Sequence, residues 1–246
     1  MKSRKICFLL MASFFLVGCQ TMPAQVNNGN NIDSAENKTV VLSDQYINIK
    51  HRDNKAKPSP SDNYTALGAG YLAKENYEKA MLKLQRAIKL DTTNARAYNY
   101  LGILYWKLDE YKLAESNFLQ SHKLSPYDAA INHNYGSFQC EQGNFEEGKI
   151  YYNKVFKNTL YDRLSQAHSE FGHCAIKQNQ MELAKKHLQT AIKQESRNTN
   201  ALIGMAKLFY RQQKYKLSLY YYERYIDKEK QTPDRLWLGI NIRRQT

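Results

Sequence analysis

Hydrophobic and small residues recur at a fixed spacing along most of the chain. The segment Tyr64-Thr65-Ala66-Leu67-Gly68 is matched 34 residues later by Tyr98-Asn99-Tyr100-Leu101-Gly102. The copies of this pattern are 34, 34, 36 and 34 residues apart and start near Ser61, Ala95, Ala129, Ser165 and Thr199. Each copy holds two apolar stripes of helical period, so the pattern predicts five consecutive helical hairpins.

Small residues have fixed places within each copy. The eighth place holds Gly68, Gly102, Gly136, Gly172 or Ala206, and the twentieth holds Ala80, Ala114, Gly148, Ala184 or Ser218. Small side chains at both places let the paired helices approach closely. The period and these places are similar to those of the tetratricopeptide repeat. We therefore expect an all-α fold, a right-handed superhelical solenoid of five tetratricopeptide hairpins, closed by a capping helix at residues 234–244.

The N-terminal segment predicts export. Lys2, Arg4 and Lys5 precede an apolar run over residues 6–17 that is too short to span a bilayer. The ending Leu-Val-Gly-Cys at residues 16–19 resembles a bacterial lipoprotein signal, which implies removal of residues 1–18 and acylation of Cys19 by chains such as palmitate. Gln20 follows where many inner-membrane lipoproteins have aspartate, so the resemblance implies the outer membrane, on its periplasmic face. An ordinary secretory signal with an unrelated cysteine is the alternative.

Residues 19–63 predict the acylated cysteine and a disordered tether. This segment is rich in Asn, Asp, Ser and Lys, shows no sustained apolar period, and ends in Lys57-Pro58-Ser59-Pro60. A short strand at residues 40–42 is the alternative. The folded domain is then expected to cover residues 64–246.

Charge narrows the choice of partners. The whole chain has 36 Lys and Arg against 23 Asp and Glu, and loss of residues 1–18 removes three of the basic residues. Ten basic and four acidic residues lie in the segment 207–246. Because a periplasmic chain does not meet nucleic acid, we expect no nucleic-acid partner. The partners that still fit a basic chain are anionic headgroups, peptidoglycan carboxylates and acidic protein segments.

The sequence gives little support to catalysis. Neither the cysteines nor the histidines show zinc spacing, and the chain has no nucleophile elbow, P-loop or G-x-G-x-x-G motif. We therefore expect no metal, no cofactor and no enzymatic activity. A hydrolase that uses the region of His133 and Glu141 is a weak alternative.

Two cysteines fall on adjacent repeats. Cys140 and Cys174 occupy the twelfth and tenth places of first helices that pack side by side. In an oxidising periplasm this arrangement favours a disulfide between repeats three and four. Two buried free thiols are the alternative, since facing positions need not reach the required Cα separation.

Repeats three and four carry a more specific resemblance. The runs at residues 134–143, 160–162 and 171–175, with the lipoprotein signal and Leu236-Trp237-Leu238-Gly239-Ile240, resemble the type IV pilus biogenesis/stability lipoproteins of the PilW/PilF family. Gly148, Gln139 and Asn179 depart from the usual family residues. These are pilotins of about six tetratricopeptide repeats, counting the cap. The resemblance implies a lipoprotein, expected as a monomer, that binds secretin subunits and promotes their outer-membrane targeting and multimer assembly.

A scaffold that recruits peptidoglycan enzymes is the alternative function, because the fold alone does not select a partner. Under either reading, the partner is expected in the groove formed by the first helices of the repeats. Trp106 beside Ile103 and Leu72 predicts an apolar patch there, unless Trp106 packs under a neighbouring helix. The predicted groove residues are Leu72, Asn99, Ile103, Trp106, His133, Ser137, His173, Ile176, Lys207 and Tyr210.

Overall fold

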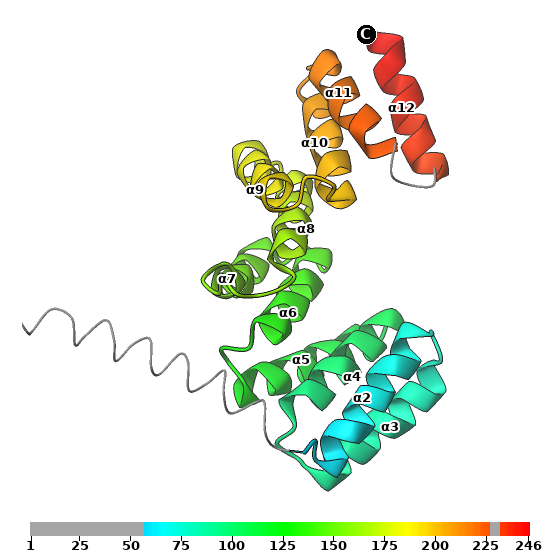
Figure 1. Cartoon of the computed structure of the whole chain (residues 1–246), viewed down its shortest axis with the longest axis vertical. Helices are drawn as coiled ribbons and strands as arrows, with labels where there is room; N and C mark the ends of the chain where they lie inside the picture. The colour runs from blue at the N-terminus through cyan, green and yellow to red at the C-terminus, as the bar shows by residue number, and fades with distance from the viewer. Residues whose placement is uncertain (1–56, 227–231) are drawn as a thin grey trace, which may run out of the picture. The chain divides into compact units, whose positions relative to one another are not determined.

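The computed structural model describes residues 57–226 and 232–246 (Figure 1). The signal segment, Cys19 and most of the expected tether lie outside these residues. The described residues form eleven helices and no strand. The helices are α2 (Pro60–Ala73), α3 (Tyr77–Leu90), α4 (Ala95–Lys107), α5 (Tyr111–Leu124), α6 (Ala129–Glu141), α7 (Phe145–Phe156), α8 (Leu164–Lys177), α9 (Met181–Gln194), α10 (Thr199–Arg211), α11 (Tyr215–Ile226) and α12 (Pro233–Gln245).

The helices pair as the repeat pattern predicts. Contacts are densest within the pairs α2 and α3, α4 and α5, α6 and α7, α8 and α9, and α10 and α11. Each pair is one of the five predicted hairpins, and α12 follows as a single helix. The all-α repeat fold expected from the sequence is confirmed.

The first helix begins at Pro60, next to the predicted repeat start at Ser61 but ahead of the domain boundary expected at residue 64. Ser59 accepts a hydrogen bond from the backbone N–H of Asp62, and the Asp62 carboxylate accepts one from the backbone N–H of Ser59. Pro60 occupies the first helical position, where its missing N–H costs nothing. Residues 60–63, which the sequence assigned to the tether, therefore belong to the helical domain, because Ser-Pro-Ser-Asp is a helix start as well as a polar linker.

Close packing explains the small residues of the eighth place. A Cβ atom added to Gly68 would lie 2.6 Å from the Leu84 side chain, and one added to Gly102 would lie 2.8 Å from the Phe118 ring. A methyl group does not fit at such distances. The glycines therefore let each first helix contact a large residue of its own second helix.

The turns inside the hairpins share one backbone conformation. The residue at the fifteenth place has φ between 56° and 84° in every repeat. Only the third repeat places a glycine there, which adopts this left-handed conformation without steric cost. The five residues are Glu75, Asp109, Gly143, Asn179 and Gln213.

Helix α12 covers the last hairpin. Leu238 and Ile242 are buried in a cluster with Tyr222 and Tyr225 of α11. Gly239 faces Tyr222 so closely that an added Cβ would lie 2.3 Å from the ring. The predicted capping role of this helix is confirmed.

Candidate functional site

A pocket of about 410 Å³ lies among the first helices of repeats two to five. We call it the groove pocket. Most of its lining residues carry polar groups, and one tryptophan and a disulfide lie beside them. The lining residues are Trp106, His133, Asn134, Ser137, Cys140, Glu141, Tyr152, Gln166, Glu170, His173, Cys174, Lys177 and Asn200.

Four of the ten predicted groove residues, Trp106, His133, Ser137 and His173, line this pocket. The others lie elsewhere along the first helices. Leu72 and Ile103 are half-buried against core clusters, Tyr210 is half-buried beside Tyr215, and Lys207 is exposed.

The structure corrects the placement of two predicted groove residues. Asn99 and Ile176 are each only 4% exposed. Ile176 packs in the core cluster that holds Val155 and Phe171, and Asn99 accepts a hydrogen bond from the Asn134 amide at 3.2 Å. The place within the repeat does not decide this outcome, because His133 and Trp106 stand at the same fifth and twelfth places and line the groove pocket. The neighbouring side chains of each repeat decide it.

Trp106 belongs partly to the core and partly to the pocket. Its ring packs edge-on against Phe138 at 5.7 Å and against Phe118 at 6.3 Å between centroids. The indole remains partly exposed and lines the groove pocket. Both readings of Trp106 therefore hold in part, and replacing it affects packing as well as the pocket surface.

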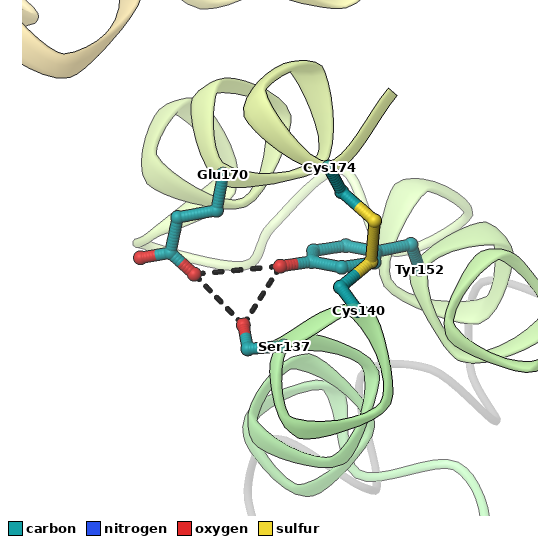
Figure 2. Close-up of a disulfide and its surroundings, with 5 residues drawn as sticks. All are labelled: Ser137, Cys140, Tyr152, Glu170 and Cys174. Carbon is teal, nitrogen blue, oxygen red and sulfur yellow. Dashed lines mark hydrogen bonds between the residues drawn. A yellow bond between two sulfur atoms is a disulfide. The ribbon is translucent and has the colours of Figure 1, made fainter. Parts of the chain in front are cut away.

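Glu170 of α8 is the centre of a hydrogen-bond network in the pocket wall. Its Oε2 atom accepts hydrogen bonds from Ser137 Oγ at 2.8 Å and from the Tyr152 hydroxyl at 3.4 Å (Figure 2). His133 Nε2 lies 3.0 Å from the same atom, and Gln166 donates to Oε1 at 2.7 Å. Donors from α6, α7 and α8 thus converge on one carboxylate.

The network keeps the carboxylate ionised. Burial raises the pKa of Glu170, but the hydrogen bond and charge of His133, with hydrogen bonds from Gln166 and Ser137, outweigh it and lower the pKa to about 2. Burial and the nearby Glu170 charge raise the pKa of Tyr152 well above its ordinary value. At neutral pH the pocket wall therefore holds a fixed negative charge bound by neutral hydroxyl donors.

His133 positions this carboxylate. The ring is 2% exposed, and its Nδ1 and Nε2 atoms each lie 3.0 Å from a partner, the Tyr161 hydroxyl and Glu170. The two partners fix the ring, and its low exposure leaves a substrate almost no access to it. The geometry weakens the hydrolase alternative that paired His133 with Glu141, whose side chain is exposed.

Cys140 and Cys174 form a disulfide next to the network (Figure 2). Their Cα atoms are 5.7 Å apart, and the bond joins α6 to α8. Both cysteines line the groove pocket. The pocket wall is thus held by a covalent link and by the hydrogen bonds to Glu170, only one turn apart along each helix.

His173 completes the side of the pocket towards repeat five. Its Nε2 atom donates to the backbone carbonyl of Asn200 at 2.8 Å, and burial lowers the pKa of the His173 imidazole.

No group of three or more potential metal ligands occurs among residues 57–226 and 232–246. In that same part of the chain, no helix is long and apolar enough to cross a membrane.

Sequence reasoning missed Glu170. The residue stands at the sixth place of repeat four, where the other repeats have Ala66, Tyr100, Asn134 and Gly204. A charge at a place that is otherwise uncharged was a readable signal. Its partners could not be read, because they lie 18 to 37 residues away in other repeats, apart from Gln166.

A second hollow lies on α2. It has a volume of about 600 Å³ and is lined by Asn63, Ala66, Leu67, Gly70, Tyr71 and Lys74. Leu67 is 50% exposed there. In the later repeats, the same side of the first helix contacts the preceding repeat. Helix α2 belongs to the first repeat, so no repeat among the described residues covers this side of it.

Comparisons with known proteins agree with the repeat structure. Family models described as TPR repeat or tetratricopeptide repeat match residues 68–109, 95–128 and 170–234. Among curated proteins, the type IV pilus assembly protein PilF of Pseudomonas aeruginosa is 26% identical over 191 residues, which cover 78% of this chain and 76% of PilF.

Two solved structures extend this similarity to three dimensions. The P. aeruginosa PilF structure has a TM-score of 0.70 at 26% identity, over 75% of this chain and 83% of that one. PilW, described as a widely conserved type IV pilus biogenesis factor, has a TM-score of 0.72 at 27% identity, over 75% of this chain and 85% of that one. The similarity therefore covers most of each protein.

Proposed function

Because this chain is a tetratricopeptide-repeat protein homologous to PilF and PilW, and so a protein of type IV pilus biogenesis, we propose that it acts as a pilotin. In this proposal, a lipid on Cys19 anchors the chain to the periplasmic face of the outer membrane. The repeats bind secretin subunits, target them to that membrane and promote their assembly into multimers. The protein acts by binding and not by catalysis.

The groove pocket is the observation that carries this proposal. It combines an aromatic surface at Trp106, exposed or half-buried amides at Asn134 and Asn200, and the fixed charge of Glu170. Aromatic side chains supply binding energy, whereas amide groups can bond to the backbone of an extended segment. This wall spans first helices from four repeats, so it is suited to a peptide segment of a client protein.

Rigidity of the wall favours binding. The carboxylate of Glu170 is held by several donors, and α6 and α8 are joined covalently beside it. A wall that is already ordered loses little conformational entropy when a segment binds. We infer that this region presents a fixed template to secretin subunits before they assemble.

Replacing Trp106 tests the proposal. We expect Trp106→Ala to reduce secretin multimers in outer-membrane fractions on non-boiled gels, while secretin monomers persist. Asn134→Arg, which fills the pocket without removing a core ring, is expected to have the same effect. Tyr127→Ala is the matched control, because Tyr127 is 92% exposed and does not line the groove pocket.

Normal multimers in both pocket variants, with the folded protein at its usual level, would contradict the groove assignment. Co-purification with the tagged mature protein separates the two partner classes. Recovery of the secretin supports the pilotin, whereas recovery of peptidoglycan hydrolases or synthases without secretin supports the scaffold that the sequence left open.

A further inference from the structure

Helix α12 has a second apolar surface, on the side away from the core. Leu236, Trp237 and Ile240 are 46%, 63% and 49% exposed. Leu238 and Ile242, on the opposite side of the helix, are buried against α11. An apolar surface on both sides of one helix indicates that the outer side also has a partner.

Arginines continue the outer surface. At 100° per residue, Leu236, Trp237, Ile240, Arg243 and Arg244 fall within about one third of the helix circumference. Arg243 and Arg244 are exposed in the last turn, where cations also stabilise the helix terminus. We call these five residues the α12 stripe. Its apolar part and its basic part follow each other along the helix.

Further basic residues lie beside the end of α12. Lys214 and Lys216, at the start of α11, share a pocket of about 340 Å³ with Gln245 and Thr246. Both lysines are exposed. The segment from Lys207 to Thr246 has ten basic and four acidic residues, so this end of the domain carries a net positive charge.

We propose that the α12 stripe docks onto an anionic lipid bilayer. Tryptophan and aliphatic side chains enter the interface between headgroups and acyl chains, while arginines bind lipid phosphates. The α12 stripe consists of only five residues on one helix, far fewer than the roughly 20 to 30 residues per side of a stable protein interface. A bilayer needs only such shallow insertion together with charge, so it is the occupant that this surface fits.

Docking would orient the groove pocket relative to the membrane. This inference rests on the proposed function only for the presence of a bilayer next to the protein. The binding itself can be measured on the chain from Gln20 to Thr246, which lacks Cys19 and contains the whole compact unit Lys57–Thr246. Failure of vesicle binding would therefore leave the pilotin proposal intact.

Vesicle binding and tryptophan fluorescence test the proposal. The chain has two tryptophans, so Trp106→Phe leaves Trp237 as the sole reporter. We expect a blue shift and co-sedimentation with vesicles of equal parts phosphatidylglycerol and phosphatidylcholine, but not with phosphatidylcholine alone. Arg243→Gln with Arg244→Gln is expected to weaken binding roughly 30-fold at low salt, and Trp237→Ser to weaken it at all salt concentrations.

Lys89→Gln with Lys123→Gln is the charge-matched control and is expected to bind like the unchanged chain. Three results would overturn the proposal: no binding to anionic vesicles, equal loss in the control, or binding only to an acidic helical peptide. Concentration-dependent dimerisation that Trp237→Ser abolishes, without vesicle binding, would assign the stripe to a second copy of the chain.

Discussion

The contacts that join repeat one to repeat two differ from those that join repeat three to repeat four. Between the first two, the Asn94 amide donates to Ser61 Oγ at 2.8 Å and to Thr65 Oγ1 at 3.2 Å, while its carbonyl oxygen caps α4. Asn198 makes the same link to Ser165 at 2.8 Å between repeats four and five. One polar residue thus caps a helix and joins it to the preceding repeat.

The junction of repeats three and four lacks this link. Arg163 stands at the cap of α8 and makes no side-chain hydrogen bond there, and Ala129 stands where Ser61 and Ser165 are found. The disulfide and the contacts of Glu170 hold this junction instead. The junction of repeats two and three also departs from the pattern, because Ala95 stands at the place of Ser61 and Asp128 caps α6. The disulfide and Glu170 set the junction of repeats three and four apart, and both line the groove pocket.

Of the three changes considered, removal of the disulfide is expected to lower the free energy of unfolding the most. Cys140→Ala with Cys174→Ala should lower the free energy of unfolding by about 2 to 4 kcal/mol, because the bond constrains the unfolded chain. Urea unfolding of the oxidised protein and the double variant measures the difference. Equal stability, or an unreduced mass equal to that of the reduced protein, would show that the bond does not hold this junction.

Loss of the Glu170 carboxylate should cost about 1.5 to 3 kcal/mol at neutral pH, because donors in the pocket wall lose a charged acceptor. The folded pKa of about 2 lies below the ordinary value of 4.5, so this contribution is complete above pH 4.5 and disappears as the pH falls towards 2. Unfolding of Glu170→Gln should therefore differ from that of the unchanged chain at pH 7 and converge with it near pH 2. A constant difference across that range would contradict the network.

Asn94→Ala should have the smallest effect of the three, about 1 kcal/mol or slightly more, since it removes one cap and one inter-repeat link. Asn76→Ala is the matched control: Asn76 is exposed and caps α3 through the Lys79 N–H. We expect Asn94→Ala to be the more destabilising variant in thermal unfolding. Equal losses would mean that the hydrogen bonds to Ser61 and Thr65 contribute nothing beyond the cap.

Most of the fold could be predicted because the same pattern of apolar and small residues recurs in each repeat. The hairpins, the cap helix and the close approach at Gly102 follow from residues within one repeat or its neighbour in sequence. The tether was extended to residue 63, beyond the start of α2, since Ser59 and Pro60 suit a linker and a helix start equally well. The site was harder: Ile176 proved buried, and Glu170 acquires its role only from side chains in other helices.

The left-handed turns inside the hairpins are positions where the sequence could be changed without touching the binding surfaces. Glu75, Asp109 and Asn179 hold a backbone conformation that Gly143 adopts freely. The steric cost of this conformation falls mainly on Glu75, because aspartate and asparagine tolerate the left-handed region better. None of these three positions lines the groove pocket or belongs to the α12 stripe. Glycine at Glu75 would therefore release backbone strain without altering either binding surface, while it would also make the unfolded chain more flexible.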